Sequence, residues 1–285
     1  MAIKIRRDSS FTETLVSNLR KYYEEKKQNR IGNAPIHVSD ILPSTCIRKQ
    51  YYSRLVTDND IINEDSLYHF IRGESSEFAI TRMANMGIAQ ADLNFEGLVA
   101  HPDIMTDDQI VELKDTTSGK RLDLTDQQFQ SYLRQLLYYL VITGIEKGII
   151  SIRYSIGELR WIKSDENGEH YIMPKNSRNP GIESWSVYLP KNDLTRDILK
   201  NEIMRRKNLL HHALKSTNPS ILPRLVEPMK SRKCPHCPFY DICYNKDGET
   251  QEAVEMALEK DLLDISGVVD YRPFFDHTEC ETGSY

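Results

Sequence analysis

The alternating stretch QIVELKDT, residues 109–116, constrains the fold of this chain more than any other feature, because it is typical of a half-buried strand. The preceding stretch FEGLVAHPDIM, residues 95–105, is also predicted to be a strand. Thr106-Asp107-Asp108 between the two has the composition of a turn. The two stretches therefore predict a β-hairpin.

A helix and a further strand are predicted after the hairpin. Thr125 with Gln128 three residues later resembles a capping box, and Gly144 is a plausible helix stop. Between them, over about residues 126–143, apolar residues recur at helical spacing, namely Phe129, Leu133, Leu136, Leu137 and Leu140. Residues 149–155, IISIRYS, predict a buried strand. The order hairpin, helix, strand is typical of an α/β fold.

Other helices are predicted on both sides of this unit, at residues 10–28, at residues 64–86, in a short segment capped by Ser39-Asp40, and at residues 193–216 after an Asn192 cap. Strands and turns are predicted to alternate over residues 157–190. We divide the chain into a helical N-terminal extension (residues 1–36), a core domain (37–245) and an acidic C-terminal tail (246–285).

The composition is that of a globular protein with a core, with 39% hydrophobic and 28% charged residues in a chain of 285. No apolar run approaches the length of a membrane span, and the sequence MAIKIRRDSSFTETL has no apolar signal region, so we expect a cytoplasmic protein. The net charge of −5 argues against a generally basic nucleic-acid coat. Local clusters such as Arg205-Arg206-Lys207 still allow contacts with phosphates.

The hairpin carries three charged groups that can converge. Glu112 and Lys114 share one face of their strand, and the hairpin brings Asp103 opposite them. Two carboxylates form an oxygen-rich site for Mg²⁺ or Mn²⁺, and a lysine beside them can orient a water and offset charge on a phosphoryl group. The same spacing also arises by chance in a solvated hairpin with a surface ion pair, and spacing alone leaves both interpretations open.

Neighbouring elements add polar groups to this picture. Gln135 and Tyr139 are four residues apart, so they lie on one face of the predicted helix. Glu77, on the predicted helix before the hairpin, can supply a third carboxylate.

These motifs in this order resemble the PD-(D/E)XK nuclease superfamily, and within it the RecB-like branch. Pro102-Asp103 and Glu112-Leu113-Lys114 match its eponymous motif, and Gln135-Leu-Leu-Tyr-Tyr139 is similar to the QxxxY motif of that branch. The family often has a histidine four residues after a glycine of its early helix, whereas here Gly73 is followed by Glu77.

The resemblance implies a restriction-endonuclease-like core, with a central mixed β-sheet flanked by helices. It implies that Asp103 and Glu112 hold Mg²⁺ or Mn²⁺, with help from Glu77 and the carbonyl of Leu113. Lys114 then positions or activates the water, and Gln135 and Tyr139 support the site or contact DNA.

A cluster of cysteines lies near the C-terminal end of the core domain. Cys234, Cys237 and Cys243 supply three thiolates within ten residues. In a cytoplasmic protein this spacing indicates a metal site rather than disulfides. The chemistry alone suits either zinc or an iron–sulfur cluster.

Together with Cys46-Ile-Arg-Lys-Gln-Tyr-Tyr52, this cysteine cluster resembles the iron–sulfur RecB-type nucleases. These include the CRISPR-associated Cas-four family and the nuclease domain of the AddAB-type enzymes, and the likeness covers roughly residues 37–245. It implies a 4Fe-4S cluster with a structural role and an exonuclease acting on single-stranded or frayed DNA. It allows CRISPR adaptation or recombination proteins as partners.

The fourth ligand of such a cluster is either Cys46 or Cys280. Loop entropy alone slightly favours Cys280, which is closer to Cys243 in sequence. Cys280 lies in the acidic stretch HTECETGSY, whereas Cys46 is followed by Arg48 and Lys49, whose charges favour a thiolate. We therefore predict Cys46.

The sequence thus predicts a metal-dependent DNA exonuclease, a hydrolase of phosphodiester bonds. Two alternatives remain: a subunit that binds or processes DNA ends with little cutting activity, and a zinc-stabilised endonuclease of the restriction type.

Overall fold

The computed structural model describes residues 9–32, 34–55, 62, 64–118, 121–155, 161–165, 168–172, 181–224 and 234–246. Within these ranges, the side chains of residues 64–65, 161–165, 168–172 and 245–246 are left undescribed. The predicted acidic tail beyond residue 246, including Cys280, lies outside the described residues.

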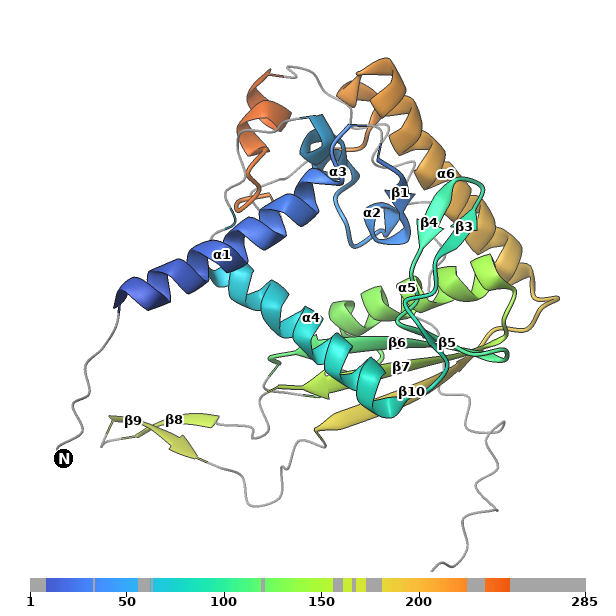
Figure 1. The fold of residues 1–285 in the computed structure, drawn as a ribbon. Coiled ribbons are helices and arrows are strands. Elements are labelled where there is room, and N and C mark those ends of the chain that lie inside the picture. The colour runs from blue at the N-terminus through green and yellow to red at the C-terminus, as the bar shows by residue number, and fades with distance from the viewer. Residues whose placement is uncertain are drawn as a thin grey trace, which may run out of the picture.

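The helices follow the predicted order, and Figure 1 shows how they surround the strands. They are α1 (Ser9–Gln28), α2 (Val38–Ile41), α3 (Ile47–Leu55), α4 (Glu64–Ala84), α5 (Gln127–Thr143) and α6 (Leu194–Ser216), with a short 3₁₀ turn η1 (Pro219–Ile221) and a π turn η3 (Ile242–Lys246). None of the described helices is both long and apolar enough to cross a membrane.

The strands form three sheets. They are β1 (Ile36–His37), β2 (Ile88–Ala89), β3 (Leu93–Phe95), β4 (Leu98–Ala100), β5 (Ile104–Met105), β6 (Gln109–Thr116), β7 (Lys147–Tyr154), β8 (Trp161–Asp165), β9 (Gly168–Ile172) and β10 (Ile182–Tyr188). The largest sheet has the order β10-β7-β6-β5-β2, a smaller one has the order β1-β4-β3, and β8 pairs only with β9.

The five-stranded sheet is mixed, as predicted. Strands β6 and β7 are parallel and are joined by α5, whereas β5 and β10 run antiparallel to their neighbours. Helices α4 and α5 flank the long strands (Figure 1). This arrangement is a mixed α/β fold with helices on both sides of the central sheet.

The hairpin of β5 and β6 is present, but residues 95–105 do not form one strand, because they span the end of β3, all of β4 and all of β5. Asn94 accepts a hydrogen bond from the backbone N–H of Gly97 at 3.0 Å, and Gly97 has a φ of +79°. A glycine makes this left-handed turn without steric cost. The turn pairs β3 with β4 in the smaller sheet, and the chain enters the main sheet only at Ile104.

Helix α5 packs closely on the main sheet at Gly148. A Cβ atom on this glycine would lie 2.8 Å from the side chain of Leu136, closer than real Cβ contacts. Gly144, in the left-handed conformation, ends the helix as predicted, and its N–H donates to the carbonyl of Leu140 at 3.1 Å. Gly148 therefore allows α5 to lie close to β7, and Gly144 fixes where the helix ends.

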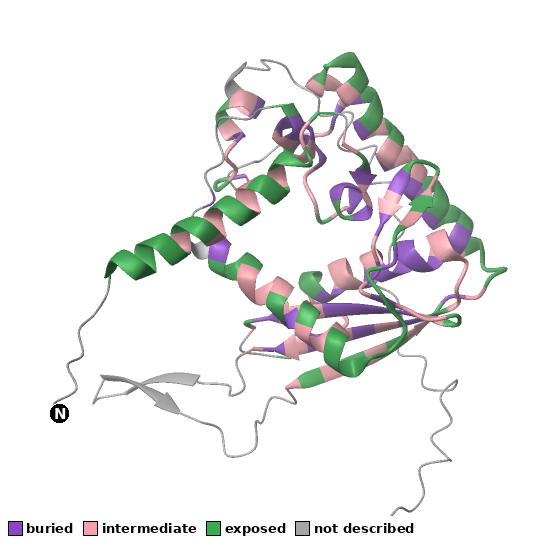
Figure 2. Ribbon diagram, in the orientation of Figure 1, coloured by how far each residue is buried: buried purple, intermediate pink, exposed green. Residues whose placement is uncertain are grey.

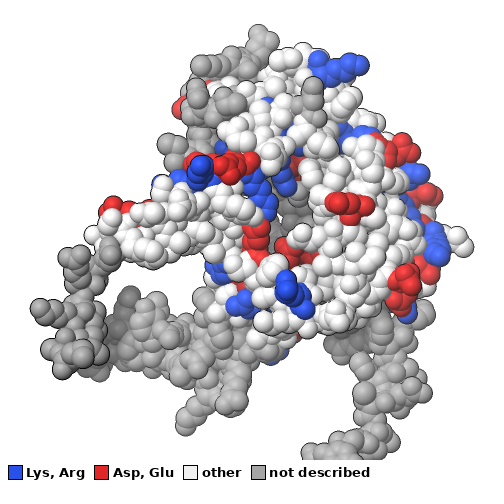
Figure 3. Space-filling model, in the orientation of Figure 1, with Lys and Arg blue, Asp and Glu red and all other residues white. Residues whose placement is uncertain are grey.

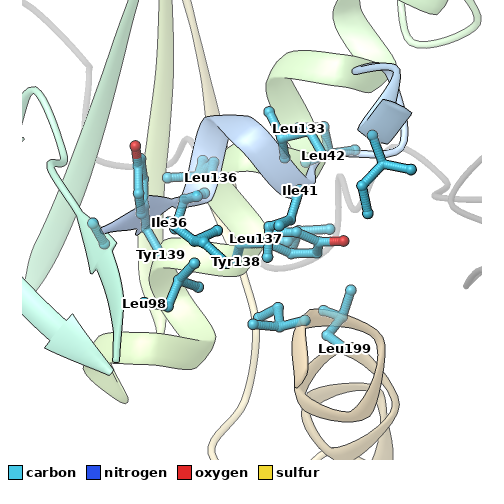
Figure 4. Packing of buried hydrophobic residues seen from close by; sticks show 14 of the residues in the cluster. Ile36, Ile41, Leu42, Leu98, Leu133, Leu136, Leu137, Tyr138, Tyr139 and Leu199 are labelled. Atoms are coloured by element: carbon cyan, nitrogen blue, oxygen red, sulfur yellow. The ribbon is translucent and has the colours of Figure 1, made fainter. Parts of the chain in front are cut away.

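The main hydrophobic core lies between α5, α6, α2 and the sheets, as Figure 4 shows. Leu136, Leu140 and Ile150 are completely buried there, and Leu199 of α6 is buried with them. In Figure 2 the buried residues concentrate in this region, whereas α1 has no buried residue. Burying a side chain of this size stabilises the folded state by about 1.5–3 kcal/mol.

Three predicted helix caps are wrong by one or more residues. Helix α6 is capped by Asp193 rather than Asn192, and its carboxylate accepts a hydrogen bond from the N–H of Thr195 at 2.8 Å. Helix α5 starts after Asp126, and α2 starts after His37. At α2 the carboxylate of Asp40 is buried, where it accepts a hydrogen bond from the N–H of His37 and pairs with Arg54. Several cap-forming residues are adjacent at each start, and tertiary contacts decide among them.

Candidate active site

The carboxylate of Asp103 lies against β6. It accepts a hydrogen bond from the backbone N–H of Leu113 at 2.6 Å. The β5–β6 turn holds this position, because the N–H of Thr106 donates to the carbonyl of Gln109 at 2.9 Å. The structure thus brings Asp103 beside the strand that carries Glu112 and Lys114.

Glu112 is completely buried. Its Oε1 accepts a hydrogen bond from Lys114, whereas its Oε2 has no hydrogen-bond partner among the described residues. Buried polar atoms of native proteins nearly always have a partner, so an oxygen without one calls for a physical explanation.

Helix α5 contributes a short chain of hydrogen bonds to the site. Lys114 Nζ lies 3.3 Å from Gln135 Oε1, and Gln135 Nε2 donates to the hydroxyl of Tyr139 at 3.1 Å. That hydroxyl donates to the carbonyl of His101 at 3.2 Å. Figure 4 shows Tyr139 at the edge of the core with its hydroxyl pointing away from Leu98. The pair Gln135 and Tyr139 therefore links Lys114 to the segment just before Asp103.

Glu77 lies on α4 near the same carboxylates. Gln90 connects them, because its side chain donates to Glu77 and its backbone N–H donates to the carbonyl of Asp103 at 3.1 Å. Gly73 lies one helical turn earlier on α4.

The electrostatics of the site are unfavourable for two ionised carboxylates. Burial raises the pKa of Asp103 well above its usual range, and Glu112 and Glu77 add to the rise against the opposing charge of Lys114. Burial likewise raises the pKa of Glu112, against Lys114 and with a contribution from Glu77. Burial alone would lower the pKa of Lys114, but Glu112 and Asp103 outweigh it and raise it to about 12. The lysine is therefore fully charged, and the carboxylates favour a proton or a cation nearby.

Sequence reasoning missed two residues on the face of α5 that meets Lys114. The ring of Tyr132 lies 5.5 Å from Lys114 Nζ, and the side chain of Gln128 donates to the hydroxyl of Tyr132. Positions 128, 132, 135 and 139 follow helical spacing, so the stripe was visible in the sequence. Only the last two belong to a recognised motif.

The four predicted cluster cysteines occupy one region. They are free thiols, and Cys234 and Cys243 are buried while Cys46 and Cys237 are half-buried. Burial raises the pKa of Cys237, and the neighbouring Cys46 and Cys234 add to the rise. Burial also raises the pKa of Cys243, and Cys46 is among its neighbours. Residues almost two hundred positions apart in sequence thus come within electrostatic range.

Contacts between α3 and the segment around Cys243 hold this region together. Arg48 donates to the carbonyl of Leu222 at 3.1 Å and lies 3.8 Å from Cys243 Sγ. The rings of Tyr52 and Phe239 stack with centroids 5.9 Å apart. Among the residues that the structure describes, however, no three or more His, Cys, Asp and Glu side chains are arranged as a ready-formed metal site.

No family model matches the sequence, and no curated protein sequence matches it. Among solved structures, that of SSO0001 is similar at 18% identity and a TM-score of 0.46, over 81% of this chain and 96% of SSO0001. The alkaline exonuclease LHK-Exo from Laribacter hongkongensis is similar at 11% identity and a TM-score of 0.39, over 64% of this chain and 91% of LHK-Exo. A phage-related exonuclease from Haemophilus somnus is similar at 9% identity and a TM-score of 0.39, over 64% of this chain and 83% of that protein.

Proposed function

We propose that this protein is a metal-dependent DNA nuclease of the RecB-like branch of the PD-(D/E)XK superfamily, with a restriction-endonuclease-like core. The observation that supports this most is the meeting of Asp103, Glu112 and Lys114, with one buried oxygen of Glu112 lacking a hydrogen-bond partner among the described residues. A fold-stabilising ion pair gains nothing from such an oxygen, whereas a cation site needs one.

The residues present fit a divalent metal ion. Asp103 and Glu112 would hold Mg²⁺ or Mn²⁺, with the carbonyl of Leu113 and with Glu77 completing the oxygen ligands. The cation would polarise the phosphate and lower the pKa of a bound water. Burial first, and then neighbouring carboxylates, raise the pKa values of both carboxyls, and a bound cation would stabilise their ionised forms.

In this proposal, Lys114 acts on the reacting groups, and Gln135 and Tyr139 hold it in place. Lys114 carries a permanent positive charge and orients the water or offsets charge on the phosphate oxygens. Gln135 holds the ammonium of Lys114, and Tyr139 holds Gln135. Because burial raises the pKa of Tyr139, its hydroxyl stays protonated and can donate to the carbonyl of His101.

The preferred substrate in this proposal is single-stranded DNA or a frayed DNA end with a free terminus. This preference rests on the resemblance of the motifs. On the face drawn in Figure 3, Lys and Arg side chains of the described residues lie among Asp and Glu side chains.

We further propose that Cys46, Cys234, Cys237 and Cys243 hold a 4Fe-4S cluster with a structural role. The donor set fits in kind, because Cys46 lies within electrostatic range of Cys237 and Cys243, Cys234 lies within range of Cys237, and Arg48 and Lys49 supply positive charge. When bound, the cluster would tie the segment before the core domain to the segment after it. Zinc on the same thiols is the alternative.

The cluster proposal makes a prediction about two single variants. Anaerobically purified Cys46→Ser should lose its iron, its brown colour and much of its thermal stability, because one of four ligands is gone. Cys280→Ser should keep all three and serves as the matched control. Loss of iron from Cys280→Ser but not from Cys46→Ser would refute the assignment, and zinc in place of iron would favour the alternative.

The nuclease proposal is tested with end-labelled linear and circular single-stranded DNA in Mg²⁺, Mn²⁺ or EDTA. We expect products from linear DNA with either metal, none in EDTA, and none from Asp103→Ala under any condition. Cleavage of the circle would favour an endonuclease instead. Tight binding to DNA ends without any cleavage would favour a subunit that binds or processes ends.

A further inference from the structure

One stripe of polar side chains runs along α5 toward Lys114. Gln128, Tyr132, Gln135 and Tyr139 are spaced four, three and four residues apart, which places them on one face of a helix. Gln135 and Tyr139 belong to the recognised motif, whereas Gln128 and Tyr132 extend the stripe by two turns toward the start of α5.

The ammonium of Lys114 has three neighbours in this region. Two are hydrogen-bond acceptors, Glu112 Oε1 and Gln135 Oε1, and the third is the face of the Tyr132 ring at 5.5 Å. A lysine ammonium has three N–H donors. An aromatic face attracts the cation through its quadrupole and needs no lone pair to do so. The ring can therefore hold the ammonium in place while an N–H remains available for a substrate oxygen.

Gln128 links the hydroxyl of Tyr132 to strand β6. Gln128 Nε2 donates to the hydroxyl of Tyr132 and lies 3.3 Å from Thr116 Oγ1. Thr116 is buried at the end of β6, the strand that also carries Lys114. Strand and helix are therefore connected on both sides of the lysine, through Gln135 and through Gln128.

We propose that Tyr132 is a positioning residue for Lys114, that its aromatic ring makes the essential contact, and that its hydroxyl only helps to hold the ring. The inference rests on the proposed nuclease function and adds to it a residue outside the recognised motifs. If Glu112 turns toward a metal ion, the ammonium of Lys114 loses its hydrogen bond to Glu112. The ring of Tyr132 does not compete for the cation, so it keeps the ammonium directed at the phosphate.

Steady-state kinetics with labelled single-stranded DNA separate the ring from the hydroxyl. Tyr132→Leu removes the ring and should lower kcat by about 3- to 30-fold, with KM and the half-saturating Mn²⁺ concentration unchanged. Tyr132→Phe keeps the ring and should remain within about twofold of the unmodified protein. Tyr138→Phe, on the other side of α5, controls for general damage to the helix and should leave kcat unchanged.

Nuclear magnetic resonance of the metal-free protein tests the contact without any catalysis. The Hε and Nζ signals of Lys114, assigned with Lys114→Ala, should be shifted upfield by the ring current. This shift should disappear in Tyr132→Leu and persist in Tyr132→Phe.

An unshifted Lys114 signal would overturn the proposal, and so would a Tyr132→Phe variant as slow as Tyr132→Leu, or a loss confined to KM. Failure of the nuclease function gives a different pattern. In that case Asp103→Ala behaves like the unmodified protein while the Lys114 signal still responds to Tyr132.

Discussion

Helix α5 lies near a buried carboxylate on each of two faces, and the two carboxylates differ in how many of their oxygens have hydrogen-bond partners among the described residues. Arg134 and Tyr138 face Glu202 of α6, whereas Gln135 faces the pair formed by Lys114 and Glu112 of β6. Glu202 is 2% exposed and Glu112 is completely buried, so both depend on the protein for their hydrogen bonds.

Glu202 has partners on both oxygens. Arg134 Nη1 lies 3.1 Å from Oε1 and 2.9 Å from Oε2, and the hydroxyl of Tyr138 donates to Oε1. A buried charge is tolerated when its partners are complete, and here those partners join two helices.

Glu112 has a partner on one oxygen only among the described residues, and Asp103 and Glu77 add like charge nearby. Such an arrangement lowers the stability of the folded protein when no ligand is bound. A bound ligand of opposite charge would restore that stability. The complete set of partners makes Glu202 part of the architecture, whereas the open oxygen of Glu112 is what the proposed cation site predicts.

The largest effect should follow from removing the charge that acts on the substrate. Lys114→Ala should lower the single-turnover rate in Mn²⁺ by about 10²–10⁴-fold, because its ammonium acts mainly in the transition state. DNA binding, measured by fluorescence anisotropy, should persist. A Lys114→Ala variant that cleaves at nearly the original rate would contradict the site.

The second prediction compares the same change at both carboxylates. Glu202→Gln should destabilise the protein by about 3–5 kcal/mol, because it breaks the buried ion pair between Arg134 and Glu202. Glu112→Gln in EDTA should destabilise the protein far less, because burial and Glu77 disfavour the charge that it removes and Asp103 remains near Lys114. Urea unfolding measures both, and equal destabilisation by the two variants would erase the distinction.

The third prediction concerns pH in the absence of metal. The folded-state pKa values of Asp103 and Glu112 are raised, so the folded protein binds protons more tightly than the unfolded chain. The stability present at low pH is therefore lost as pH rises above the ordinary carboxyl range of about 4 and through the raised values. In EDTA, the combined variant Asp103→Asn, Glu112→Gln should lose less Tm over this rise. Parallel curves for the two proteins would show that these carboxyls do not titrate as described.

The smallest effect should come from one hydroxyl at the structural cluster. Tyr138→Phe removes one of the hydrogen bonds to Glu202 and should cost about 1–2 kcal/mol, with no change in cleavage rate per folded molecule. Urea unfolding and single-turnover cleavage on the same preparation check both parts. A slower rate at unchanged stability would mean that this face of α5 also serves the site.

Local patterns predicted most of the element order. The alternation in QIVELKDT and the apolar stripe of α5 each depend only on residues within one element. Both elements, β6 and α5, are present. Two breaks within residues 95–105 were not predicted: the Gly97 turn between β3 and β4, and residues 101–103 between β4 and β5. Local patterns also did not predict which of several neighbouring residues caps each helix.

Within the site, the sequence placed Glu112 and Lys114 on one face because a strand has a period of two. It could not show that one oxygen of Glu112 has no hydrogen-bond partner within the described part of the chain, or that Tyr132 faces Lys114. The cluster of Glu202 and Arg134 was missed altogether, because it joins residues 68 positions apart through packing of α5 on α6. Such pairings depend on tertiary contacts that no local pattern records.

Calorimetric titration of the protein with Mn²⁺ tests the central claim most directly, because it measures whether Glu112 takes part in binding a cation. The unmodified protein should bind Mn²⁺, Glu112→Gln should lose that binding, and Tyr138→Phe, which alters only the Glu202 cluster, should keep it. Unchanged Mn²⁺ affinity in Glu112→Gln would contradict the assignment of Asp103 and Glu112 as the metal site.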